Sequence, residues 1–143
     1  MTVSNRLTVG LAAAFFVVAP LSGMGLETIG LHVAVCLGML VFGIAVFAMG
    51  WVGGGDAKLI AATSLWLGLA PLLHYLVIAS LAGGVMTIVL LKFRTMPLPA
   101  WAGQQPWITR LHSADRGAPY CIALAVAGLS AYPSSKLFAL AAL

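Results

Sequence analysis

Apolar residues form five long runs along this chain, and short polar or glycine-rich stretches separate them. The runs cover residues 7–23, 29–50, 57–73, 75–91 and 118–133. A helix needs about 20 mainly apolar residues to cross the hydrocarbon core of a bilayer, with a range of about 17–25. The runs approach that length, so we predict an all-α fold. It would be a single membrane-embedded domain over residues 1–143, a polytopic helical bundle with about five transmembrane helices.

The breaks between the runs contain residues that end helices. Pro20 closes the first run, and Gly53–Gly55 separate the second run from the third, because three successive glycines favour no regular element. Pro71 and His74 predict the break between the third and fourth runs. Prolines and polar residues gather in 92–117, which we predict to be the one substantial polar loop.

The composition indicates that lipid is the solvent for most of the surface. Hydrophobic residues make up 62% of the chain and charged residues only 7%, whereas a soluble domain has about 25% charged residues. We therefore expect the lipid bilayer as a partner. The net charge of +4 comes from basic residues that are spread along the chain, so we expect no nucleic-acid partner.

The positions of the basic residues predict the orientation, because cytoplasmic loops of membrane proteins carry an excess of Lys and Arg. With a cytoplasmic N-terminus, six of the seven basic residues lie on the cytoplasmic side: Arg6, Lys58, Lys92, Arg94, Arg110 and Arg116. Only Lys136 lies outside. We therefore expect Asp56 and the 92–117 loop on the cytoplasmic face.

Few side chains could carry chemistry, because the chain has only three carboxylates. Glu27 fits a solvated loop charge, and Asp115 fits a loop ion pair with Arg116 or a helix cap. Cys36 and Cys121 lie far apart without metal-ligand spacing, so we interpret both as small buried hydrophobes and expect no metal or cofactor. The histidines His32 and His74 fit interfacial positions near the outer helix ends.

Asp56 differs from the other two carboxylates, because it follows Gly53-Gly54-Gly55 and opens an apolar helix. Asp is a favoured helix N-cap, and that structural interpretation stays open. Three glycines exceed what a cap needs, however, and an ionisable residue at membrane depth suggests a functional site. Aspartic proteolysis is the chemistry that such a residue could support, and it requires a second carboxylate.

The residues around Asp56 resemble a known motif. The stretch Gly53-Gly54-Gly55-Asp56-Ala57-Lys58-Leu59 is similar to the GxGDxKL motif of the type IV prepilin peptidases, which are GxGD intramembrane aspartyl proteases. Downstream, Gly117-Ala118-Pro119-Tyr120-Cys121-Ile122-Ala123-Leu124 resembles the start of the last helix in the small prepilin peptidases of Tad/Flp pilus systems.

The resemblance implies a membrane aspartic endopeptidase of the bacterial inner membrane that cleaves prepilin leaders at the cytoplasmic face. Asp56 would be one of two catalytic aspartates, with Gly53, Gly55 and Lys58 as supporting motif residues and no metal or cofactor. A prepilin would be the substrate and the pilus assembly machinery a further partner. The paired Cys-x-x-Cys motifs of the large bifunctional prepilin peptidases do not occur, so N-methylation of the cleaved pilin is not expected.

One departure concerns the first catalytic aspartate of the family, which shortly precedes an Ile-Pro-Asn-Arg-Leu-like stretch. Val3-Ser4-Asn5-Arg6-Leu7 resembles that stretch, so the first helix and its aspartate are expected upstream of Met1. Three explanations stay open: a start site placed too far downstream, a truncated and inactive homologue, or a second carboxylate supplied by Asp115. The alternative function is a non-enzymatic membrane subunit of a pilus or secretion assembly.

Overall fold

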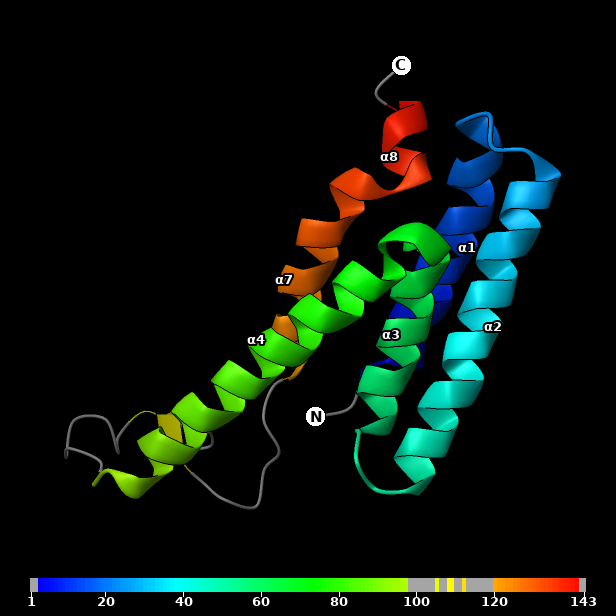
Figure 1. Cartoon of the computed structure of the whole chain (residues 1–143). Coiled ribbons are helices and arrows are strands. Elements are labelled where there is room, and N and C mark those ends of the chain that lie inside the picture. Colours follow the sequence, from blue (N-terminus) through cyan, green and yellow to red (C-terminus); the bar gives the residue numbers. More distant parts are fainter. Residues whose placement is uncertain (1–2, 98–104, 106–107, 110–111, 113–119, 142–143) are drawn as a thin grey trace.

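The chain is helical throughout the part that the computed structural model describes, which is residues 3–97, 105, 108–109, 112 and 120–141. The helices are α1 (Asn5–Leu21), α2 (Leu26–Ala48), α3 (Gly54–Leu67), α4 (Leu69–Thr95), α7 (Tyr120–Ala131), the 3-10 turn η1 (Tyr132–Ser134) and α8 (Lys136–Ala141) (Figure 1). No strand occurs within these residues. The all-α prediction is confirmed, whereas most of the predicted 92–117 loop, Asp115 included, lies outside the described residues.

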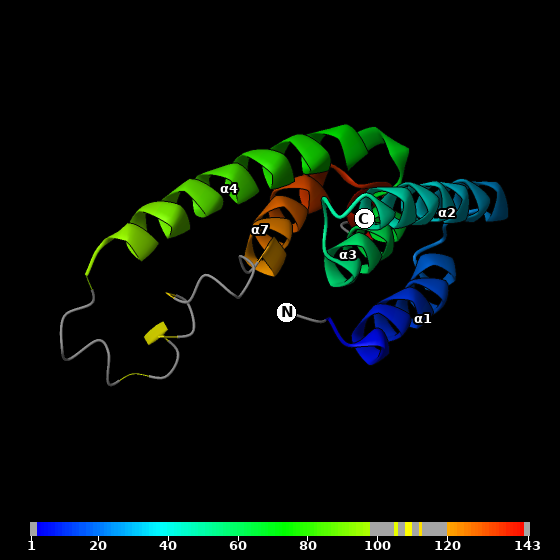
Figure 2. The same ribbon diagram turned by 90° about the horizontal axis from the view of Figure 1, so that it is seen from below.

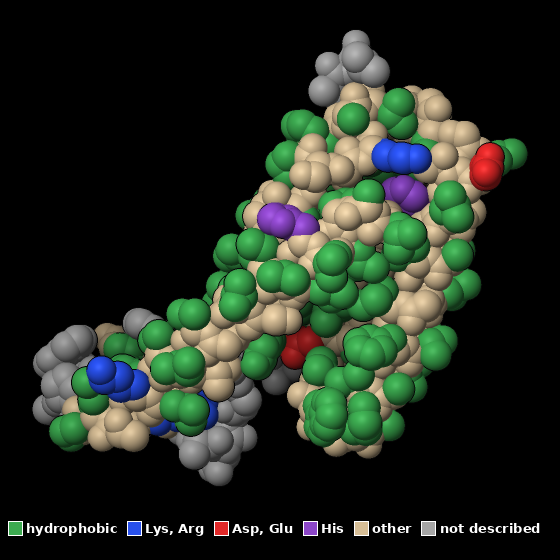
Figure 3. Space-filling view, viewed as in Figure 1, with side chains coloured by type: hydrophobic (Ala, Val, Ile, Leu, Met, Phe, Trp, Pro, Cys, Tyr) green, Lys and Arg blue, Asp and Glu red, His purple; other side chains and the backbone are tan. Residues whose placement is uncertain are grey.

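Two helices are long and apolar enough to cross a membrane, judged by length and composition. They are α2, with 23 residues, and α4, with 27. The helix α1 and the segment Tyr120–Ser134 are apolar but shorter. Large apolar side chains are exposed along α2 and α4, such as Val41 at 68% and Ile88 at 67%, and apolar groups cover much of the visible face (Figure 3). Such a surface fits lipid better than water.

The break between α3 and α4 lies at Gly68 and not at the predicted Pro71 and His74. Gly68 has a φ of 72°, a left-handed conformation that costs glycine little and other residues more. Pro71 is the third residue of α4. Proline is tolerated in the first turn, because the N–H that it lacks would have no partner inside the helix. The predicted end of the third helix at residue 73 is therefore wrong by about two turns of helix.

The helices form a V whose apex lies near Gly68. On one side α2 packs along α3, and on the other α4 packs along α7 (Figures 1 and 2). One buried cluster joins the two sides at the apex: Leu67, Tyr75, Ala79, Leu124, Ala127 and Ala131. A second cluster joins α1, α3 and α8: Phe15, Ala19, Met24, Leu65 and Leu137. The V therefore opens at the end where α3 begins.

His32 is a structural residue at the closed end of the V. Its side chain is 4% exposed and therefore lies inside the protein. Its Nδ1 atom lies 2.8 Å from the carbonyl oxygen of Leu65, to which an Nδ1–H would donate. Its ring stacks on Phe15 with 5.7 Å between the ring centroids. His32 thereby ties α2 to the last turn of α3 and to α1.

Candidate active site

The start of α3 sets the position of Asp56. Gly53 is the N-cap residue and the helix begins at Gly54, so Asp56 is the third helical residue and not the cap. No side-chain hydrogen bond caps this helix. The capping role left open by the sequence is therefore not the role that Asp56 has, although its charge still suits a helix N-terminus.

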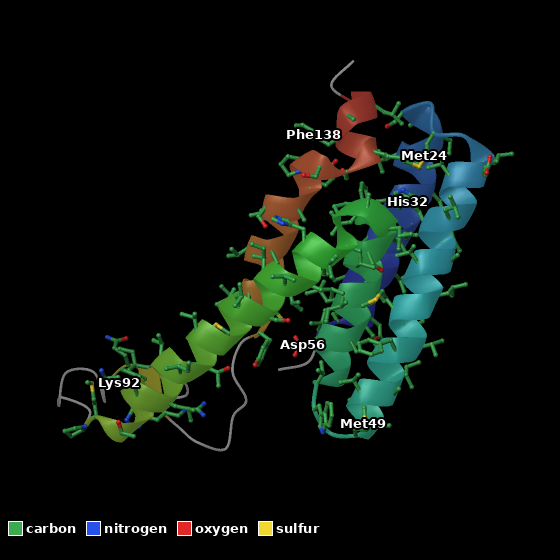
Figure 4. The ribbon with its side chains drawn as sticks, in the orientation of Figure 1. Met24, His32, Met49, Asp56, Lys92 and Phe138 are labelled. Carbon is green, nitrogen blue, oxygen red and sulfur yellow. The ribbon has the colours of Figure 1, made fainter. Side chains whose placement is uncertain are left out.

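The packing of α3 on α2 turns Asp56 towards the open V. Ala57 is 4% exposed, and a Cβ atom placed on Gly43 of α2 would lie 3.0 Å from the Cβ of Ala57. The backbones of α2 and α3 therefore approach closely at Ala57. Successive helical residues differ by about 100° in direction, so Asp56 points away from α2. Its side chain lies at the mouth of the V (Figure 4), where the space-filling surface is notched (Figure 3).

The two oxygens of the Asp56 carboxylate have different surroundings. Oδ1 lies 3.6 Å from Sγ of Cys121 on α7, a contact in which the thiol is the donor. Oδ2 faces Gly53, where an added Cβ atom would lie 3.0 Å from this oxygen. The absence of a side chain at residue 53 therefore leaves room for Oδ2. Among the described residues no ion pair involves Asp56, and the side chain is half-buried.

The N-terminal segment lies against the first turns of α3. A Cβ atom on Gly55 would lie 2.8 Å from the backbone nitrogen of Val3, so only glycine allows this approach. Lys58 donates a hydrogen bond from Nζ to Oδ1 of Asn5 at 3.0 Å. The structure thus brings Val3 and Asn5 into contact with two of the motif residues named from the sequence, Gly55 and Lys58, which lie on either side of Asp56 in the chain.

Comparison with known proteins gives one family match. The sequence model of the type IV leader peptidase family matches residues 1–88, a range that includes the N-terminal segment, all of α3 and most of α4. The chain belongs to the type IV leader peptidase family. No curated protein and no solved structure gave a significant match.

Membership in this leader peptidase family indicates a prepilin peptidase-like protein whose chemistry is proteolysis. It also implies a prepilin as substrate, and together with the two long apolar helices it indicates membrane association. Within the described residues, the remaining carboxylate is Glu27, in the first turn of α2 at the opposite end of the molecule. No three metal-ligating side chains gather in the described part of the chain.

Sequence reasoning missed one neighbour of Asp56 and one neighbour of Lys58. Cys121 was interpreted as a small buried hydrophobe, but it is half-buried and its thiol contacts the carboxylate. Asn5 was noted only as part of a motif-like stretch, and it accepts the hydrogen bond from Lys58. The family resemblance of 117–124 marked the region of Cys121, but no sequence signal marked the thiol itself.

Proposed function

We propose that this chain is an aspartic endopeptidase that cleaves the leader from type IV prepilins of the Flp/Tad class at the cytoplasmic membrane face. Asp56 would be one half of its catalytic pair. One observation carries the proposal: Asp56 lies at the mouth of the V (Figure 4), on the first turns of α3, which contact Val3 and Asn5 through Gly55 and Lys58, and no ion pair involves it among the described residues. Within the described part of the chain the carboxylate is therefore not neutralised by an ion pair, which suits a group that takes part in chemistry.

The chemistry needs two carboxylates that share a proton, because two close like charges do not both ionise readily. The ionised carboxylate accepts a proton from the attacking water, and the protonated one polarises the scissile carbonyl. After attack, a proton is returned to the leaving amine. Asp56 would take one of these two roles, and the assignment of the roles depends on its partner.

The contact between Val3 and Gly55 supports a partner carboxylate that lies shortly upstream of Val3. In the family that this chain resembles, the first catalytic aspartate shortly precedes the stretch that corresponds to Val3–Leu7. Because Val3 lies against the residue before Asp56, a side chain just upstream would enter beside the helix that carries Asp56. Asp115 remains an alternative partner that lies outside the described residues.

The proposed orientation places Asp56 on the side of the membrane from which a prepilin leader would approach. Under the positive-inside rule, six of the seven basic residues lie on this cytoplasmic side together with Asp56. A leader peptide held in the cytoplasm would meet Asp56 at the open end of the V. The apolar part of the substrate would remain in the bilayer.

Co-expression with a Flp-type prepilin tests this proposal. The chain and a version extended through the in-frame DNA upstream of Met1 would each be produced with the substrate, whose size is followed by gel electrophoresis. We expect the extended version to shorten the prepilin and its Asp56→Asn variant to leave the prepilin uncut.

The outcomes separate the alternatives. Cleavage by the 143-residue form itself would remove the need for an upstream carboxylate and would point to Asp115. No cleavage by either form would contradict the peptidase proposal and would favour an inactive homologue or a structural subunit of a pilus or secretion assembly.

A further inference from the structure

The first turn of α7 is fixed against α4 by Tyr120. A Cβ atom on Gly83 would lie 2.5 Å from Cε1 of Tyr120, so the ring packs directly on the backbone of α4. The hydroxyl of Tyr120 lies 3.2 Å from Oγ1 of Thr87, and Oγ1 of Thr87 donates its own proton to the carbonyl of Gly83 at 2.8 Å. Since the proton of Thr87 is used, Tyr120 is the donor in their mutual hydrogen bond.

This attachment determines where Cys121 lies. Cys121 directly follows Tyr120 in α7, and its half-buried Sγ lies 3.6 Å from Oδ1 of Asp56 on α3. An ionised carboxylate can only accept hydrogen bonds, so the thiol proton is directed at Oδ1. The contact crosses the V and links its two sides near the open end.

We propose that Cys121 is a positioning residue for Asp56: its thiol engages Oδ1, which directs Oδ2 to the space above Gly53 for the reacting water. The inference rests on the proposed function, because it gives the two oxygens separate tasks in that reaction. Without the thiol, rotation about the last bond of the Asp56 side chain would be free to exchange the two oxygens. A serine at residue 121 would preserve the donor, and an alanine would remove it.

The contact can be tested without measuring proteolysis, because it couples the reactivity of the thiol to the charge of Asp56. The thiolate is the form that reacts with maleimides, and an anion beside the sulfur opposes loss of the thiol proton. In a Cys36→Ala background Cys121 is the only thiol, since the chain has two cysteines. Its rate of reaction with N-ethylmaleimide at pH 7.5 can be followed by intact mass.

We expect Asp56→Asn to raise the labelling rate of Cys121 by about threefold or more, because it removes the neighbouring charge. The matched control is Glu27→Gln, which neutralises a carboxylate at the far end of the molecule and should leave the rate unchanged. A second measurement is made at a pH at which the thiol is fully ionised. There the labelling rate depends only on how accessible the sulfur is to the reagent, and the variants should have equal rates. Equal labelling rates for all variants at pH 7.5 would show that Cys121 does not engage Asp56.

The consequence for catalysis is tested in a cleaving form of the protein. Cys121→Ala should lower kcat by about threefold to tenfold with little change in KM, and Cys121→Ser should restore most of the loss. Equal activity of the alanine variant and the parent would overturn the positioning role. If no form cleaves prepilin, the proposed function fails, whereas the labelling experiment still reports whether Cys121 engages Asp56.

Discussion

At the scale of single residues, two polar side chains lie in apolar helices and differ in how their polar atoms are used. His32 has a carbonyl partner on α3 and a ring partner on α1, so its polar atoms serve the fold. Asp56 has a thiol and a glycine beside its two oxygens and no ion pair within the described part of the chain. An ionisable group in such surroundings, in a protein of apolar helices, is a candidate for chemistry.

Replacing His32 by alanine should destabilise the protein by about 2–4 kcal/mol, because it removes a buried hydrogen bond and leaves a cavity beside Phe15. Thermal unfolding of the protein in detergent would measure the loss. His74→Ala is the control, since His74 is exposed on α4 and should change stability little. Equal losses for the two variants would show that His32 has no structural role.

At the scale of helices, the interface of α4 and α7 depends on the glycine at residue 83, which has no side chain. The ring of Tyr120 occupies the space that a side chain at residue 83 would need. The next residue, Gly84, has no atom within 4 Å of its added Cβ. The two adjacent glycines therefore differ in their surroundings although the sequence presents them alike.

Gly83→Ala should cost about 1–3 kcal/mol, because the ring of Tyr120 has to move or α7 has to shift. Gly84→Ala should be neutral or stabilising by up to about 1 kcal/mol, since alanine is the better helix former and meets open space. Denaturant unfolding monitored by circular dichroism compares the two variants. A loss from Gly84→Ala as large as that from Gly83→Ala would contradict this interface.

Hydropathy predicted α1 and α2 well but not the turn between α3 and α4. The apolar runs at residues 7–23 and 29–50 correspond to α1 and α2 with shifts of about two or three residues. The α3–α4 break was predicted at Pro71, because a proline inside an apolar run is a strong signal for a helix end. The actual break depends on Gly68 and on the buried ring of His32 beside it, a tertiary contact that no local pattern contains.

At the scale of the whole molecule, the V separates a closed end, where His32 lies, from an open end, where Asp56 lies (Figure 4). The position of Asp56 at a helix start could be predicted from three glycines and an apolar run. The contacts of Cys121 with Asp56 and of Val3 with Gly55 could not be predicted, because hydropathy gives the apolar character of each segment and not which faces meet. The Cys121–Asp56 contact joins residues 65 positions apart in the sequence, and the Val3–Gly55 contact joins residues 52 positions apart.

The orientation of the molecule is open to direct measurement. Single cysteines would be placed at exposed residues of opposite ends, Trp51→Cys and Lys136→Cys, in a Cys36→Ala, Cys121→Ala background. The positive-inside distribution predicts that a membrane-impermeant maleimide labels Lys136→Cys in intact cells. It should label Trp51→Cys only after the membrane is opened. The reverse pattern would place Asp56 outside and would contradict cytoplasmic cleavage.

The rate of prepilin processing by purified protein is the sharpest test of whether Asp56 carries the chemistry. The upstream-extended form would be compared with its Asp56→Asn and Glu27→Gln variants, and co-purification of uncut prepilin would report substrate binding. We predict that Asp56→Asn lowers the rate at least about a hundredfold while prepilin still binds, because the variant keeps the shape and loses one of the two carboxyl groups that the reaction needs. Glu27→Gln should process at the parental rate. Processing by Asp56→Asn at the parental rate would contradict a catalytic role of Asp56.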